Sequence, residues 1–424
     1  MNKQRILFVL LWVGALLFHY HARDRWNEGV FVLPAAIWAV LNPSSLPRLL
    51  ILAAVQTLDA LMNLPIKNNH WLLTTIVDIT LLSSYFLYYR SAKYDWWKVF
   101  CSSTRILMIV LYSFAVLHKL NSDFFNPEYS SAALFYEAYA QRFPFLPNCS
   151  FIKEAFIPLT LFMEALLPCL LFFSRTRLLG VIIALLFHFV IAYNPMSHFW
   201  DFSSLSFPLL LLSAPEQISC AILSALTRIK KYLAALGVAL FALHFFDSIL
   251  AALAAWTIYG STILVALLIE LRKGGYACVR SCKSPLTLLL LVFLLFNGFS
   301  PYLGLKTESS FSMFSNLRTE GNTTNHLFIP TTLQIFDFQK DLVQIVSSND
   351  PYLLRLKEEN LQLPFFELQK YVKTHATIQV KYIRAGAYYT DKELRAASSP
   401  HVLLAQFLIF KPIPQQLLPV RGSR

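Results

Sequence analysis

Ionisable side chains lie inside, or at the ends of, the long apolar runs of this sequence. The ionisable side chains that could take part in catalysis or binding are Asp59, His70, Asp78, His118, Lys119 and His188. An ionisable side chain inside a membrane span costs about 2.5–3.5 kcal/mol on insertion scales, so each one indicates a functional site with a partner nearby. If the apolar runs are membrane helices, these groups all fall at the level of the outer leaflet. The sequence therefore predicts a polar cluster in one half of a helical bundle.

Lys119 has the clearest chemical use in this cluster. Removal of an ammonium group from water penalises its charged form, so burial favours a neutral amine that can act as a general base toward an amphiphilic substrate. A carboxylate such as Asp59 or Asp78 within ~4–6 Å would instead keep the lysine charged. The sequence leaves both alternatives open.

Each of these groups also has a purely structural interpretation. Lys119 could be an interfacial anchor whose ammonium group reaches the lipid head groups, and His70 could cap a helix. Asp59 and Asp78 could bond to neighbouring helices. His188 has apolar neighbours on both sides in the stretch LLFHFVIAYN, so it must find a hydrogen-bond partner inside the bundle.

Two other polar residues lie on apolar runs. Tyr193 follows His188 near the end of the same run, and we expect it beside the substrate. Glu164, in LFMEALLP, lies deeper in another run, and a helix-packing or loop-anchoring role is the simpler expectation for it.

The chain that must position these groups is strongly apolar. Of its 424 residues 56% are hydrophobic and only 14% are charged, with a mean hydropathy of +0.52, which excludes a water-soluble domain of this size. A bilayer core is crossed by about 20 apolar residues. Candidate spans cover residues 6–20, 30–41, 49–64, 71–89, 99–118, 155–173, 178–193, 202–220, 232–250, 251–271 and 286–299. We predict an all-α polytopic membrane bundle of about nine to eleven spans.

Basic residues orient this predicted bundle. Most of the lysines and arginines before residue 301 fall on the same side as Lys3 and Arg5 when the spans alternate, so the N-terminus is expected in the cytoplasm and the C-terminus outside it. The formal charge of +12 is thereby explained by topology, and no nucleic-acid partner is expected. The six cysteines are scattered without ligand spacing, so we expect no metal site and no disulfide framework.

Composition changes near residue 301. Charged residues return, and strand-like runs at 377–383 and 402–409 surround a helical stretch near 353–372. We therefore expect two domains, a transmembrane domain at 1–300 and a small extracytoplasmic α+β domain at 301–424. The polar segment 305–326 is either a plug over the mouth of the bundle or an ordinary connector, and the loop at 121–151 is expected to form one wall of the pocket.

Three stretches of the sequence carry a family resemblance. They are IKNNHWLLTTIVDITLL, LYSFAVLHKLNSDFF and LLFHFVIAYNPMSHFWDFSSLSFPLLLLSAPE. Over about residues 5–300 the chain resembles the HTTM family, the transmembrane domain of vitamin K-dependent gamma-carboxylases and their bacterial relatives. The matching positions are Asn68, Asn69 and His70, then Lys119 and Leu120, and finally His188 with Phe202 and Ser203.

The resemblance implies a demanding chemistry. It implies that Lys119 deprotonates a reduced quinone of the vitamin K hydroquinone type, and that the oxygenated quinone then removes a proton from a glutamate gamma carbon so that carbon dioxide adds. His70 would assist at the reacting centre, and Asn69 would hold His70 or the substrate. The family's carboxylase has a second lysine before the base, where this chain has His118.

The predicted function is therefore a membrane-embedded, gamma-carboxylase-like protein that uses Lys119, His70 and Asn69 on a quinol or another lipid-soluble substrate. His118, His188, Asp59, Asp78 and Tyr193 are the expected substrate-binding residues. We expect membrane lipid, a quinone and a protein or peptide substrate as partners, although the compact tail argues against carboxylation of a protein. The expected location is a bacterial cytoplasmic membrane, or the endoplasmic reticulum in a eukaryote.

The sequence is also compatible with two other classes of protein. In a non-catalytic scaffold or lipid-binding protein, the buried polar residues would serve helix association alone. A transporter would be expected to show broken helices at matching places in two halves, and the sequence shows no such pattern.

Overall fold

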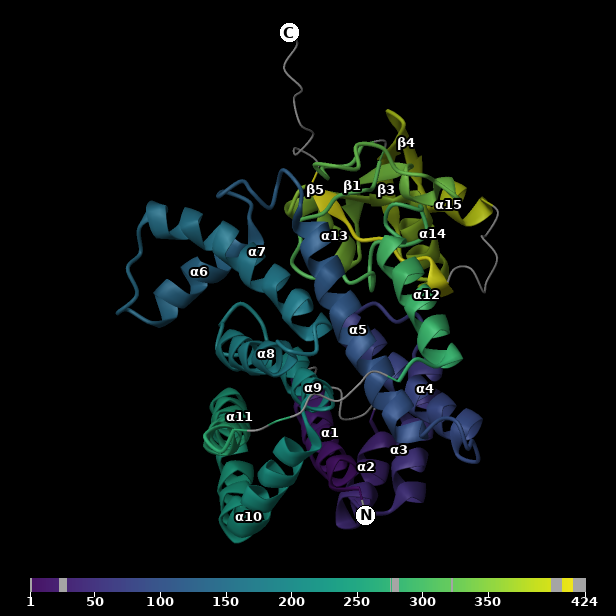
Figure 1. Ribbon diagram of the computed structural model, residues 1–424. Helices are drawn as coiled ribbons and strands as arrows, with labels where there is room; N and C mark the ends of the chain where they lie inside the picture. The colour runs from purple at the N-terminus through teal and green to yellow at the C-terminus, as the bar shows by residue number, and fades with distance from the viewer. Residues whose placement is uncertain are drawn as a thin grey trace.

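A computed structural model of the chain describes residues 2–22, 29–274, 276, 282–321, 323–397 and 406–414. Most of this part is helical, and a small antiparallel sheet follows the helices (Figure 1). The helices before residue 300 are α1 (Lys3–Ala22), α2 (Val32–Leu41), α3 (Leu46–Met62), α4 (Asn69–Tyr88), α5 (Trp96–Lys119), α6 (Ser131–Arg142), α7 (Ser150–Phe172), α8 (Arg177–Ile191), α9 (Trp200–Leu211), α10 (Glu216–His244), α11 (Ser248–Leu271) and α12 (Pro285–Phe299).

Five helices among the described residues are long and apolar enough to cross a membrane. They are α1, α4, α5, α7 and α11, while α2, α8 and α12 are apolar but shorter. This composition is compatible with the predicted multi-pass protein, and the predicted number of spans and their orientation remain predictions. The sequence missed α6, which lies within the loop expected at 121–151. It also placed two spans at 202–220 and 232–250, where the chain forms the short α9 and a single long α10.

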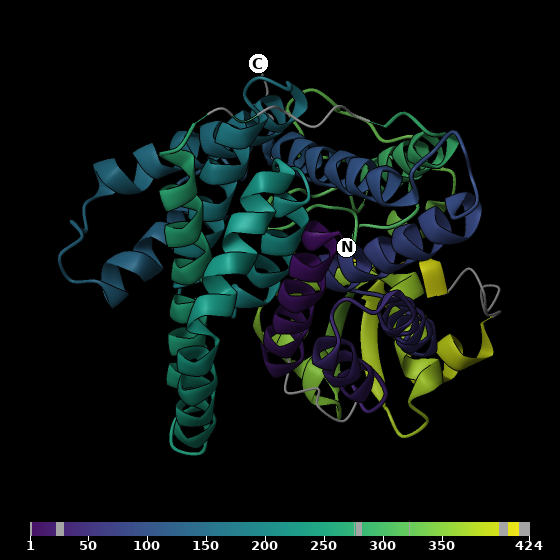
Figure 2. The same ribbon diagram turned by 60° about the horizontal axis from the view of Figure 1, so that its bottom comes forward.

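Helices α1 and α5 form the centre of the helical part, because each packs against several other helices. Helix α5 begins at the capping residue Asp95, whose carboxylate accepts hydrogen bonds from the backbone N–H groups of Trp97 and Lys98 at 2.9 and 3.2 Å. It packs against α4, α7 and α12, whereas α1 packs against α2, α9 and α10. Helices α10 and α11 lie side by side as a long hairpin that projects from the rest (Figure 2).

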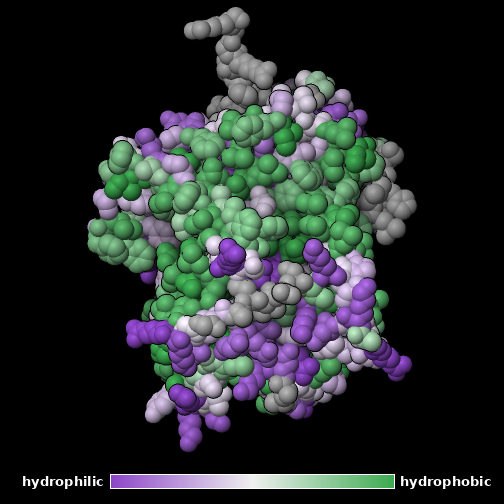
Figure 3. All heavy atoms as spheres, viewed as in Figure 1, coloured by the Kyte–Doolittle hydropathy of each residue, from purple (hydrophilic) through white to green (hydrophobic). Residues whose placement is uncertain are grey.

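The outer surface of the helical part is unusually apolar. Phe86, Phe162, Phe241 and Phe293 are each exposed, on four different helices. On the face shown in Figure 3, hydrophobic side chains form a broad band and hydrophilic side chains gather below it. An exposed apolar surface of this extent indicates contact with lipid or with another protein.

The described residues between 337 and 414 form a compact α+β unit. Its five-stranded antiparallel sheet has the order β4-β3-β1-β2-β5, and α13 and α14 contribute buried leucines and valines to a core around Tyr382. The elements are η1 (Asp337–Gln339), β1 (Leu342–Ser348), α13 (Pro351–Glu358), β2 (Leu361–Pro364), α14 (Phe365–Thr374), β3 (Val380–Arg384), β4 (Ala387–Thr390), α15 (Asp391–Ala396) and β5 (Ile413–Pro414).

The sequence predicted this unit only in outline. The strand expected at 377–383 corresponds to β3, but the helix expected at 353–372 is interrupted by β2. Asn360 adopts a positive φ of 56° after α13, which turns the chain so that β2 can pair with β1. Of the strand expected at 402–409, residues 402–405 lie outside the described residues, and the described remainder forms no strand.

Candidate functional site

A large cavity lies between the helical part and the segment that leads to the sheet. Its volume is about 980 Å³, and its walls come from the ends of α4, α5 and α9, from α6, α7 and α8, and from residues 307–316. Of the predicted site residues, Asn69, His70, Lys119 and His188 line it. The fold therefore brings together groups from three different helices, as the sequence predicted for them.

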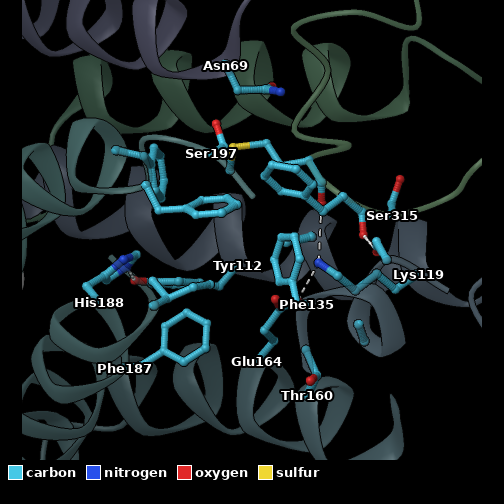
Figure 4. A pocket seen from close by; sticks show the side chains of 18 of the residues that line it. Asn69, Tyr112, Lys119, Phe135, Thr160, Glu164, Phe187, His188, Ser197 and Ser315 are labelled. Atoms are coloured by element: carbon cyan, nitrogen blue, oxygen red, sulfur yellow. Dashed lines mark hydrogen bonds and ion pairs between the residues drawn. The ribbon is translucent and has the colours of Figure 1, made fainter. Parts of the chain in front are cut away.

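Lys119 lies at the end of α5 and forms an ion pair in this cavity. Its Nζ atom donates a hydrogen bond to Oε2 of Glu164 on α7 at 2.7 Å, and the two side chains are only 5% and 12% exposed. The same ammonium group lies 3.4 Å from the carbonyl oxygen of Met313 and 5.9 Å from the ring centre of Phe124. Figure 4 shows Lys119 and Glu164 pointing toward one another inside the pocket. The carboxylate that pairs with the lysine is thus Glu164, and neither Asp59 nor Asp78.

His188 lies on another wall of the cavity and is also paired. Its Nε2 atom lies 2.7 Å from the hydroxyl oxygen of Tyr112 on α5, and its Nδ1 atom lies 3.5 Å from the hydroxyl of Ser203 on α9. The partner expected for His188 inside the bundle is therefore present. Because the hydroxyl groups can each donate or accept, the imidazole can adopt either neutral tautomer.

The segment from 305 to 316 closes one side of the cavity, as expected for a plug. Four residues of this segment that are not glycine, Ser309, Phe311, Phe314 and Asn316, adopt positive φ values of 51°, 65°, 49° and 56°. Such backbone conformations cost on the order of 1–3 kcal/mol each, so they persist only where the surroundings impose them.

Side-chain amides of the helical part hold this segment in place. The Asn69 carbonyl oxygen accepts a hydrogen bond from the backbone N–H of Phe311 at 2.7 Å, and the Asn121 amide donates to the carbonyl oxygen of Ser315 at 2.6 Å. Asn297 of α12 donates to the carbonyl oxygen of Ser309 at 3.1 Å. Asn69 therefore positions the plug, a role that the sequence did not predict.

His70 is part of a third polar group on the cavity wall. Its Nε2 atom lies 3.4 Å from Oδ2 of Asp201, at the start of α9, and the other carboxylate oxygen of Asp201 contacts Nδ1 of His19 at the end of α1. Both His70 and Asp201 line the cavity. Asp201 and His19 were not predicted as site residues from the sequence, although each is a polar residue at the end of an apolar run.

Two of the other predicted substrate-binding residues, Asp59 and Tyr193, do not line the cavity. Asp59 accepts a hydrogen bond from the Tyr20 hydroxyl at 3.2 Å. Tyr193 bonds to the Thr257 hydroxyl at 2.7 Å on α11. These contacts join neighbouring helices, which matches the structural interpretation of buried polar residues.

His118 and Asp78 are also placed away from the cavity. The Nε2 atom of His118 lies 3.0 Å from the carbonyl oxygen of Gly298 on α12, because His118 faces a different side of α5 from Lys119. Asp78 is fully buried in α4. Neither residue therefore contacts a ligand in this cavity as it stands.

Charged side chains outside the helices line the part of the cavity nearest the sheet. They are Lys67, Glu308 and Lys411. Burial raises the pKa of the Glu308 carboxyl group, and the nearby charge of Lys411 partly opposes this rise. Beside them, burial lowers the pKa of Lys306 to about 8. This end of the cavity can therefore bind a polar or charged part of a ligand.

Comparison of the chain with protein-family models, with curated proteins and with solved structures finds no match. The resemblance to the HTTM family therefore stays a prediction from its motifs.

Proposed function

We propose that this protein is a membrane-embedded enzyme, similar to the vitamin K-dependent gamma-carboxylases, in which Lys119 acts as a general base on a quinol or another lipid-soluble hydroxyl compound. The observation that carries the proposal is the Lys119–Glu164 pair, which is buried in a cavity large enough for such a molecule. Ligand pockets of drug-sized molecules typically enclose about 300–1,000 Å³.

Glu164 would take part in the base chemistry of Lys119. Transfer of one proton along the 2.7 Å hydrogen bond during the reaction would give an uncharged amine beside a carboxylic acid. The amine can then accept the proton of a substrate hydroxyl group, which yields an ammonium group and a phenolate held next to each other. No proton has to pass through bulk water in this exchange.

The shape of the cavity supports a lipid-soluble substrate. Leu159 of α7 and Leu186 and Val190 of α8 line the cavity and are 52%, 43% and 58% exposed. A cavity wall with this much exposed apolar surface suits a lipid-soluble substrate better than a water-soluble one. The polar end near Glu308 and Lys411 would hold the head of an amphiphile.

The remaining polar groups have supporting roles in this proposal. Tyr112 and His188 form a hydrogen-bonded pair that can orient a second oxygen of the substrate. The plug held by Asn69 excludes water from the reacting centre, which protects a reactive intermediate.

Turnover of a defined quinol tests the proposal. The full chain in lipid nanodiscs is given vitamin K hydroquinone in air, and its oxidation is followed by absorbance. Wild-type protein should oxidise the quinol faster than empty nanodiscs, and Lys119→Ala should lower this enzymatic rate about 10²–10⁴-fold, as expected for loss of a general base. Lys153→Ala is the matched control, because Lys153 of α7 pairs with Glu137 away from the cavity.

A non-catalytic lipid-binding protein is the alternative. The same apolar cavity would then bind the quinol or a lipid without converting it. Equal rates for wild-type protein, Lys119→Ala and empty nanodiscs, together with saturable binding of the quinol, would favour this alternative.

A further inference from the structure

The group formed by His19, His70 and Asp201 has the composition of a metal site. The three residues come from the last turn of α1, the first turn of α4 and the first turn of α9. His19 and Asp201 are buried, and His70 is half-buried. His19 and Asp201 lie 182 positions apart in the chain, so only the packing of the helices brings them together.

The distances within this group suit a shared ion. One ligand atom from each residue lies within 4.8 Å of the others. The His70 Nε2 and Asp201 Oδ2 atoms lie 3.4 Å apart. Two ligands at about 2.0–2.1 Å from a tetrahedral Zn²⁺ are separated by about 3.3 Å. The spacing of His70 and Asp201 therefore suits one shared ion, whereas the contact between His19 and Asp201 is shorter than this separation and would have to lengthen.

His19 supplies an independent observation. Its Nε2 atom is buried and has no hydrogen-bond partner among the residues that the structure describes. A buried polar atom of this kind calls for an explanation, and an ion is one that the neighbouring ligands support.

The surroundings suit a carboxylate ligand and hold the imidazole of His19 in place. Asp201 lies in the first turn of α9, where the helix dipole stabilises a negative charge. The ring of Trp71 packs 4.0 Å from the ring of His19, which limits the movement of the imidazole. Two imidazoles and one carboxylate are the ligand set of many zinc and non-haem iron(II) sites, and they leave at least one position open.

We propose that His19, His70 and Asp201 bind one divalent transition-metal ion, of the Zn²⁺ or Fe²⁺ type, on the wall of the cavity. Because His70 and Asp201 also line the cavity, an ion bound by them would lie at the cavity wall. No metal site was expected from the sequence, because the three ligands are far apart along the chain and show no ligand spacing. The metal site does not depend on the proposed function, because binding requires only these three side chains.

Metal content tests this proposal directly. Full-length protein is purified in detergent, stripped with EDTA, loaded with Zn²⁺ or, without oxygen, with Fe²⁺, dialysed, and analysed by mass spectrometry for metals. Wild-type protein should keep close to one ion per chain. Asp201→Asn and His70→Ala should each lower the affinity for the ion at least about tenfold. His375→Ala is the matched control, since His375 is exposed in the sheet unit and should leave the metal content unchanged.

Two results would overturn the proposal. One is a wild-type protein that keeps neither ion after dialysis. The other is a folded Asp201→Asn variant that keeps as much metal as wild type. If the variants fail to fold, the thermal midpoint of EDTA-stripped wild-type protein decides, because an ion that binds only the folded state must raise it. No rise with either Zn²⁺ or Fe²⁺ would contradict the site.

Discussion

The Nζ atom of Lys119 on α5 lies 2.7 Å from the Oε2 atom of Glu164 on α7. These two residues are 45 positions apart in the chain. Because both side chains are buried, each group depends on the other for the stability of its charge. We expect Glu164→Gln to lower the free energy of unfolding by about 3–5 kcal/mol, because it leaves a buried ammonium group without its anion. Denaturant titration in mixed micelles measures this loss.

The double variant Lys119→Met with Glu164→Leu is the control for this prediction. Replacement of a buried ion pair by apolar side chains of similar volume is often neutral or stabilising, so the double variant should be more stable than Glu164→Gln. A loss below about 1 kcal/mol in Glu164→Gln would instead indicate that the pair rests in its uncharged form.

The hydrogen bond between Tyr112 and His188 should contribute to stability as well. Tyr112→Phe removes the hydroxyl group and leaves a buried imidazole nitrogen without its partner, which costs about 1–3 kcal/mol. Tyr232→Phe is the matched control, since Tyr232 is 73% exposed on α10 and should change the free energy of unfolding by less than about 0.5 kcal/mol. Equal effects of the two substitutions would show that this hydrogen bond does not stabilise the folded protein.

Gly180 permits the close approach of α7 and α8. A Cβ atom at this position would lie 2.8 Å from Cβ of Leu170 and 3.1 Å from two backbone atoms of α7. Because backbone atoms cannot move aside cheaply, Gly180→Ala should destabilise the protein by about 1–3 kcal/mol. Gly237→Ala, on α10, has nothing within 4 Å of the added methyl group and should stabilise the helix by about 0.5–1 kcal/mol. Thermal unfolding of the two variants should therefore shift in opposite directions.

Lys306 should make stability depend on pH in a defined window. Burial lowers the pKa of its ammonium group from 10.5 to about 8 in the folded protein, so the unfolded chain binds more protons between these values. Stability therefore rises with pH from about 8 to about 10.5, while below pH 8 this group contributes no slope. Lys306→Met should remove this rise, and Lys340→Met, which alters a half-buried lysine paired with Asp337, should keep it. The free energy of unfolding across this window is the measurement, and a rise that persists in Lys306→Met would contradict the assignment.

Much of the helical part was predictable from local sequence. Apolar runs of the right length, such as 71–89 and 286–299, coincide with α4 and α12 to within a few residues at each end. Helix α6 was missed because its sequence, SAALFYEAYAQR, is short and mixed in polarity, so no long apolar run marks it. The strand β2 was missed because four residues between two helices give too little pattern to separate it from them.

The candidate site was predictable only in part. Polar residues on apolar runs identified Lys119, His70 and His188, and all three line one cavity. The same criterion also selected Asp59 and Tyr193, whose side chains point to neighbouring helices. A helix places residues on all sides of its axis, and the sequence of one helix does not state which side faces which neighbour.

The amino-acid sequence by itself determined the apolar character of the chain, the approximate limits of most of its helices and the positions of the buried polar groups, because these depend on residue type and on spacing of a few residues. Tertiary structure alone decided the partners. It paired Lys119 with Glu164, His188 with Tyr112, and both His19 and His70 with Asp201. Each of these contacts joins two helices, so it exists only once their packing has fixed the rotation and the depth of each helix against the next.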